Sequence, residues 1–135
     1  MCHPSGVKGG AQPSVVYFNV WPFRRVAMTK LTIKDSLEKL SHHQGTFIKL
    51  FSHGTLEVEI YKPDQVDLQK PHARDEVYVI STGAGEFVCG SEKAPVATGD
   101  VLFVPAGMEH RFLNFTDDFS AWVFFYGPEG GEKNS

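Results

Sequence analysis

The stretch GDVLFVPAGMEHRFLN, from Gly99 to Asn114, most constrains how this chain of 135 residues can fold. A β-favouring run, VLFV, leads into Pro105-Ala-Gly107, which is a turn-forming sequence. A second short run follows, with His110 just inside it. A strand fixes the direction of an imidazole, and the turn fixes how the chain enters that strand. The pattern predicts two strands joined by a tight turn, with a histidine that is either a structural residue or a ligand.

The rest of the chain also favours strands. Leu56–Tyr61, LEVEIY, alternates strictly between apolar and polar or aromatic residues. Further candidate strands are 46–51, 76–82, 86–89, two pieces within 96–104, 110–115 and 120–126. Turn residues recur roughly every eight to twelve positions, which is typical of a β-sandwich, a barrel or a jelly roll. One short helix is predicted over Asp35–Leu40, with Asp35 as its N-cap and Glu38 completing a capping box.

The first 27 residues differ from the remainder. They are rich in Gly, Pro and Ser, and their one apolar run, near Val15–Val20, could form an edge strand. Met28 then begins MTKLTIKDSLEKL, which reads like the natural opening of a small protein. We therefore expect residues 1–27 to be an extension, disordered or forming one edge strand. Residues 28–135 are expected to form the barrel domain, with its core at about 46–127.

The 99–114 stretch resembles the second motif of the cupin superfamily, G-x5-P-x-G-x2-H-x3-N. Every named slot is filled, by Gly99, Pro105, Gly107, His110 and Asn114. The resemblance implies a single-domain, all-β jelly-roll barrel, also called a double-stranded β-helix, with one short N-terminal helix.

The upstream stretch PHARDEVYVISTG is similar to part of the first cupin motif, G-x5-H-x-H-x3-4-E-x6-G. His72, Glu76 and Gly83 match its second His, its Glu and its closing Gly. Lys70 replaces the first His and Asp64 replaces the opening Gly. In cupins the two motifs form neighbouring strands whose His and Glu side chains meet inside the barrel. The resemblance therefore implies a metal site built from His72, Glu76 and His110.

The chemistry of these residues supports the implied metal site in part. His72 and Glu76 have the same parity on an extended strand, so both can face one interior. Two imidazoles and one carboxylate suit a divalent metal such as Fe, Mn, Ni or Zn. In the alternative, a metal-free barrel, Glu76 pairs with Lys70 or Arg74. An ammonium group in the ligand slot would repel a divalent cation, unless Lys70 points to the rim or is deprotonated by burial. Gln69 could add a neutral oxygen ligand.

Three residues near Glu76 differ in whether they can line the pocket. Arg74 could anchor a substrate carboxylate, or could instead pair with a carboxylate at the surface. Tyr78 shares the parity of Glu76 and could line the pocket or simply belong to the core. Asp75 has the opposite parity and is expected outside the barrel.

Composition and charge narrow the function. The net charge is −3 with neutral histidines and no basic run is present, so nucleic acid is not an expected partner. The apolar runs are too short to span a membrane, and nothing at the start resembles a signal peptide, so a cytoplasmic protein is expected. We expect a metal-dependent enzyme acting on a small organic molecule, of dioxygenase or isomerase/lyase type. The alternative is a non-catalytic module that binds a small ligand or a metal.

The final predicted strand, AWVFFYG at 121–127, is apolar on both faces. A strand in a monomeric barrel needs only one apolar face, so an exposed second face indicates an interface. A homodimer is therefore expected, as the resemblance also implies. The competing explanation is that Val15–Phe23, or the helix at Asp35–Leu40, covers that face within one chain.

Overall fold

The computed structural model describes residues 28–133, and strands dominate them. The elements are the helix α1 (Ile33–Ser41) and the strands β1 (Phe47–His53), β2 (Leu56–Tyr61), β3 (Asp75–Thr82), β4 (Ala84–Cys89), β5 (Glu92–Ala97), β6 (Val101–Val104), β7 (His110–Leu113) and β8 (Ser120–Tyr126). In this part of the chain, no helix has the length and apolar character needed to cross a membrane. The extension predicted for residues 1–27, with its possible edge strand, lies outside the described residues.

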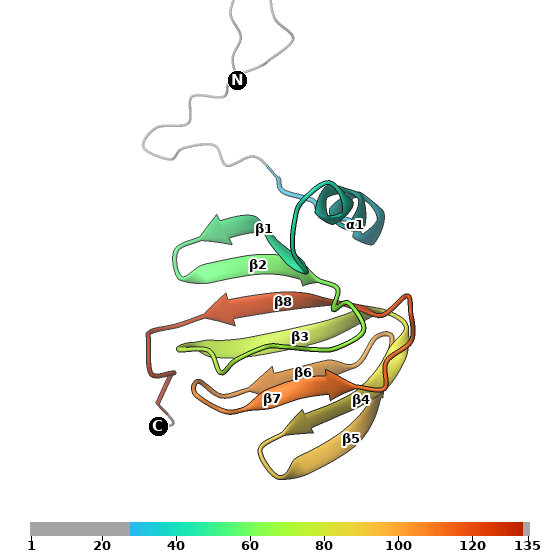
Figure 1. Ribbon diagram of the computed structural model, residues 1–135. Helices are drawn as coiled ribbons and strands as arrows, with labels where there is room; N and C mark the ends of the chain where they lie inside the picture. Colours follow the sequence, from blue (N-terminus) through green and yellow to red (C-terminus); the bar gives the residue numbers. More distant parts are fainter. Residues whose placement is uncertain (1–27, 134–135) are drawn as a thin grey trace, which may run out of the picture. The chain divides into compact units, whose positions relative to one another are not determined.

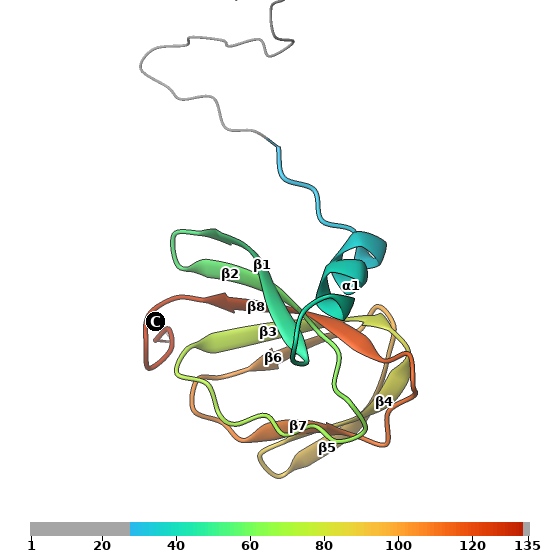
Figure 2. The ribbon, with the colours of Figure 1, turned by 45° about the horizontal axis from the view of Figure 1, so that its top comes forward.

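Two antiparallel sheets form the barrel. The larger has the strand order β1-β2-β8-β3-β6, and the smaller has the order β5-β4-β7. The sheets face each other across the interior, and the long segment between β2 and β3 runs beside β7 (Figures 1 and 2). This arrangement confirms the all-β jelly-roll barrel with one short helix. It also places β3 and β7, which carry the two motifs, on opposite sheets.

The helix begins earlier than predicted. Thr32 is its N-cap, and the Thr32 hydroxyl accepts a hydrogen bond of 3.0 Å from the backbone N–H of Asp35. Asp35, the predicted cap, instead lies in the first turn, where its charge is favourable at the positive end of the helix dipole. Leu40 is buried, and α1 contacts β1 and β2.

The alternation of β2 is confirmed, but both of its faces are covered. Glu59 and Tyr61 face the barrel interior, where Glu59 pairs in register with Val123 of β8. Val58 and Ile60 point to the other side of the sheet and are also buried. The interior core is formed by Tyr61, Tyr78, Ile80, Phe87, Val96, Val104, Phe112, Phe119, Ala121, Val123 and Phe125.

Two glycines of the motifs have backbone conformations that favour glycine over other residues. Gly83 has φ +79°, and a Cβ there would lie 2.8 Å from the Cα of Phe119, so no larger residue fits the turn between β3 and β4. Gly107 has φ +80° in the turn that leads to β7. At the far end of the same motif, the Asn114 amide donates a 2.7 Å hydrogen bond to Glu86 of β4. These residues fix the path of the chain around the strand that carries His110.

Asp75 corrects one expectation. Its parity is opposite to that of Glu76, as predicted, but it is not solvated, because only 4% of its surface is exposed. Its carboxylate accepts hydrogen bonds from the backbone N–H groups of Ala106 (2.9 Å) and Glu132 (2.8 Å). The C-terminal segment therefore folds over the position where a solvated side chain was expected.

Candidate metal centre

His72, Glu76 and His110 meet inside the barrel. One ligand-capable atom from each lies within 4.8 Å of the others. His110 Nε2 is 3.2 Å from Glu76 Oε2, and His72 Nε2 is 3.7 Å from Glu76 Oε1. His72 comes from the segment before β3, Glu76 from β3 and His110 from the start of β7. The Glu76 carboxylate thus has an imidazole near each of its oxygens.

The orientation of His110 is set by its own turn. The Nδ1 atom lies 2.9 Å from the carbonyl oxygen of Met108, which can only accept, so Nδ1 carries a proton and donates it. Nε2 is left facing Glu76. Burial disfavours the charged ring, but the contacts with Glu76 and with the Met108 carbonyl outweigh it and raise the pKa of His110 above its usual value. A metal at Nε2 would compete with a proton at that nitrogen, and the raised pKa of His110 favours the proton.

His72 titrates in the opposite direction. Burial lowers the pKa of His72 and the nearby His110 lowers it further, although Glu76 acts against both. The ring packs edge-on against Phe125, with centroids 4.9 Å apart, and its side chain is 34% exposed. A neutral imidazole beside the cavity is the form that binds a metal.

The cluster contains polar atoms that the protein itself does not satisfy. Within residues 28–133, neither Glu76 oxygen nor His72 Nε2 has a hydrogen-bond partner, although all three atoms are buried. A buried carboxylate is costly unless it is paired, protonated or bound to a cation. The donor set, two imidazoles and one carboxylate, is one that first-row divalent metals prefer. The residues present therefore fit a metal ion.

The other residues considered from the sequence do not join this cluster. Lys70 is exposed at the edge of the cavity. Arg74 lies 3.3 Å from Glu57 Oε2 and also donates to the Thr55 carbonyl, so it pairs with a carboxylate at the surface and does not line the cavity.

A buried aspartate that sequence reasoning missed orders the segment between β2 and β3. One oxygen of Asp67 accepts from Tyr61 Oη (2.6 Å) and from the Gln69 backbone N–H (3.0 Å). The other oxygen accepts from Gln69 Nε2 (2.9 Å) and from the Phe112 backbone N–H (2.7 Å). Four donors on one carboxylate tie this segment to β2 and β7.

This network fixes Gln69 and Tyr78. Because Gln69 Nε2 donates to Asp67, Gln69 Oε1 faces Tyr78 and accepts its hydroxyl proton at 2.6 Å. Gln69 Oε1, the neutral oxygen suggested as an additional metal ligand, therefore already accepts a hydrogen bond from Tyr78. Tyr78 is fully buried, and its oxygen lies 3.1 Å from His110 Nε2. Burial, Glu76 and Asp67 keep the pKa of Tyr78 well above its usual value. Tyr78 thus belongs to the core and also contacts a member of the cluster.

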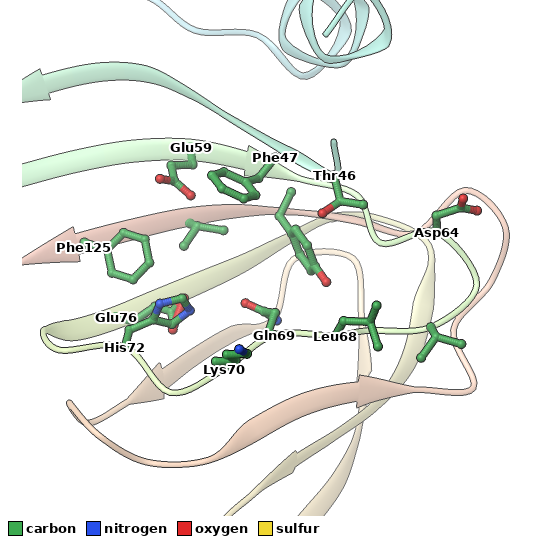
Figure 3. A pocket seen from close by; sticks show the side chains of 13 residues that line it. Thr46, Phe47, Glu59, Asp64, Leu68, Gln69, Lys70, His72, Glu76 and Phe125 are labelled. Carbon is green, nitrogen blue, oxygen red and sulfur yellow. The ribbon is translucent and has the colours of Figure 1, made fainter. Parts of the chain in front are cut away.

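A cavity of about 600 Å³ opens beside His72 and Glu76. Figure 3 shows that Phe47, Phe125 and Leu68 border it, with Glu59 on the β2 side. Sequence reasoning missed Glu59 as a pocket residue, although its parity within LEVEIY already placed it on the face of Tyr61. Burial raises the pKa of Glu59 to about 7, and the nearby carboxylates of Glu57 and Glu76 add to the effect.

Comparisons with known proteins agree with the barrel. The family model described as "Cupin domain" matches residues 57–126. "Uncharacterized protein SCO3923" from Streptomyces coelicolor is 36% identical over 98 residues, covering 70% of this chain and 93% of that protein.

Solved structures share the fold at lower identity. A protein of unknown function from Rhizobium leguminosarum has a TM-score of 0.58 at 20% identity, over 76% of this chain and 100% of that chain. The plu4264 protein from Photorhabdus luminescens has a TM-score of 0.56 at 14% identity, over 76% of this chain and 89% of that chain. Identities this low relate the chains by fold alone.

Proposed function

This chain belongs to the cupin family, and we propose that it is a metal-dependent enzyme acting on a small organic molecule. His72, Glu76 and His110 would hold one divalent first-row metal, Fe, Mn, Ni or Zn. The observation that carries this proposal is a set of buried atoms, His72 Nε2 and both oxygens of Glu76, that find no partner in the described part of the chain and lie next to a cavity of small-molecule size. We place the enzyme in the cytoplasm, with neither nucleic acid nor a membrane as a partner.

A bound metal of this kind would supply Lewis-acid polarisation or redox chemistry at a substrate oxygen, as in isomerases, lyases and dioxygenases. The chain itself orients the ligands. The Met108 carbonyl holds His110 with Nε2 toward the cluster, and Phe125 packs against the His72 ring. The apolar and aromatic side chains of the cavity wall would pack against the body of the substrate.

Metal analysis tests the ligand set. Protein purified without added metal should contain close to one equivalent by mass spectrometry, and the His110→Ala and Glu76→Gln variants should lose it. His53→Ala is the matched control, because His53 is an exposed histidine at the end of β1. Full occupancy of a metal in the His110→Ala variant would refute the site.

A second assay separates the enzyme from a non-catalytic binding module. Metal-loaded protein is incubated with a metabolite extract, and the small molecules are followed by mass spectrometry. An enzyme depletes a compound and forms a product in a time-dependent way, and Glu76→Gln abolishes the change. A binding module retains a compound on the protein without converting it, and that result would favour the alternative.

We also propose a homodimer. On the outer side of the larger sheet, Phe103 pairs in register with Val77 and Val77 with Phe124, which extends the apolar surface across three strands. Phe103 is 54% exposed and Val101, on the same strand and face, is 66% exposed. An aromatic and aliphatic patch of this kind favours association.

Light scattering at micromolar concentration tests the dimer. The full chain should have about twice its monomer mass of 15.0 kDa, and Phe103→Glu should reduce it to the monomer mass. Leu68→Glu, which alters an exposed apolar residue at the cavity instead, is the control and should leave the mass unchanged. A full chain of monomer mass would indicate that the apolar face is covered within one chain.

A further inference from the structure

The cavity beside the cluster has mostly apolar walls. Its volume of about 600 Å³ suits a small organic molecule. The apolar and aromatic side chains that line it are Phe47, Tyr61, Val66, Leu68, Val123 and Phe125. Three carboxylates, Glu59, Asp64 and Glu76, lie among them, against a single exposed ammonium, that of Lys70. The lining therefore favours a ligand with an apolar body and no negative charge near the carboxylates.

Glu59 is separated from the metal cluster by one strand. In the sheet, Glu59 of β2 pairs with Val123 of β8, and Glu76 of β3 pairs with Phe125 of β8. Figure 3 shows the Glu59 carboxylate on one side of the Phe125 ring and the His72 and Glu76 side chains on the other. A ligand lying over Phe125 would reach both the cluster and Glu59.

The Glu59 carboxylate differs from that of Glu57 in having no partner within residues 28–133. Among the described residues, no side chain or backbone group forms a hydrogen bond or ion pair with it, and the two nearby cations are used by Glu57. Lys49 Nζ lies 3.5 Å from Glu57 Oε2, and Arg74 Nη2 lies 3.3 Å from the same oxygen. A half-buried carboxylate without a donor is costly, and burial, together with the nearby Glu57 and Glu76 carboxylates, raises its pKa to about 7.

We propose that the partner is supplied by the ligand, and that the cavity binds a small amine whose apolar body packs on Phe125 and whose nitrogen donates to Glu59. This inference rests on the proposed function in one respect, since the amine would occupy the substrate cavity of the metal site. An ammonium or amine N–H satisfies a carboxylate directly. A carboxylate ligand would instead meet like charge at Glu59.

Three near-isosteric probes test the proposal: 2-phenylethylamine, 2-phenylethanol and 3-phenylpropionate. Each is titrated calorimetrically into the full chain at pH 8, with the protein both metal-free and metal-loaded. The metal-free chain should bind the amine about tenfold or more tightly than the alcohol, as a charge-assisted hydrogen bond implies, and the alcohol more tightly than the carboxylate. Equal binding of amine and alcohol, preference for the carboxylate, or no binding of the amine would overturn the proposal without any variant.

Two variants locate the effect. Glu59→Gln should weaken binding of the amine about tenfold and leave binding of the alcohol unchanged. Glu57→Gln is the matched control, because it removes the same charge from the same strand at a residue that does not line the cavity. An equal loss in both variants would show a long-range charge effect and refute a direct contact.

The outcome is separable from that of the metal proposal. Metal content is measured on the same samples by mass spectrometry. Amine binding through Glu59 in a chain that holds no metal would leave this inference standing and overturn the metal enzyme. A chain that holds a metal at the cluster and prefers the carboxylate probe would do the reverse.

Discussion

Replacing Glu59 with glutamine should stabilise the metal-free protein at high pH but not at low pH. The pKa of Glu59 is raised by burial from 4.5 to about 7 in the folded protein. Between these values the folded chain keeps a proton that the unfolded chain releases. Folding therefore binds protons over this range, and the free energy of unfolding falls as the pH rises from about 4.5 to 7.

The magnitude follows from the same difference. A full difference of about 2.5 in pKa corresponds to about 3.4 kcal/mol. Glu59 is only partly buried and opens onto the cavity, so solvent screens much of this penalty. We expect Glu59→Gln to be more stable than the parent by about 1 kcal/mol at pH 8, and the gain to vanish near pH 4.5.

Urea denaturation at pH 4.5, 6 and 8, in the presence of a chelator, measures this difference. Glu57→Gln is the control, because its charge is already paired with Lys49 and Arg74 at the surface, and it should not reproduce the gain. A difference between Glu59→Gln and the parent that is the same at all three pH values would refute the reasoning. So would a variant whose stability relative to the parent falls as the pH rises.

Three further predictions concern other parts of the chain. Asp67→Asn should lower the free energy of unfolding in urea by about 3 kcal/mol, because an amide cannot accept from all four donors; Asp64→Asn, at an exposed position, should change it by less than about 0.5 kcal/mol. Zinc affinity should fall about tenfold per pH unit as the pH drops below the raised pKa of His110, because one proton competes for Nε2; a pH-independent affinity in zinc titrations would contradict this. A chain shortened to begin at Met28 should melt within a few degrees of the full chain, whereas a large drop would show that residues before it form an integral strand.

Much of the fold could be predicted from the sequence because its signals are local. Gly83 and Gly107 mark turns that need positive φ, and the alternation of Leu56–Tyr61 marks β2. Local signals do not say which face of β2 is inward, since Val58 and Ile60 would suit a core as well as Tyr61 does. Only the pairing with β8 and the cover on the outer side decide it.

The three residues of the cluster could be proposed from motif spacing, since two short patterns each fix a strand. The residues that surround these three and hold them in place could not be predicted in this way. Asp67 accepts a hydrogen bond from the backbone N–H of Phe112, which is 45 residues away in the sequence. Nothing in the polar sequence around Asp67 distinguishes it from a solvated loop residue. For Asp75 the parity was predicted correctly but its burial was not. The C-terminal segment, which is distant in the sequence, covers this side chain.

The segment between β2 and β3 therefore determines more of the site than its sequence suggests. Asp67 orients the Gln69 amide, and Gln69 takes the only proton of the Tyr78 hydroxyl. Tyr78 can then only accept at His110 Nε2, and the Glu76 Oε2 atom, which has no hydrogen-bond partner among residues 28–133, lies 3.2 Å from the same nitrogen. A metal held by His110 at Nε2 would take the place of a proton there and would face the Glu76 carboxylate. The site is thus arranged for a positive species at one point, and the buried network selects where that point lies.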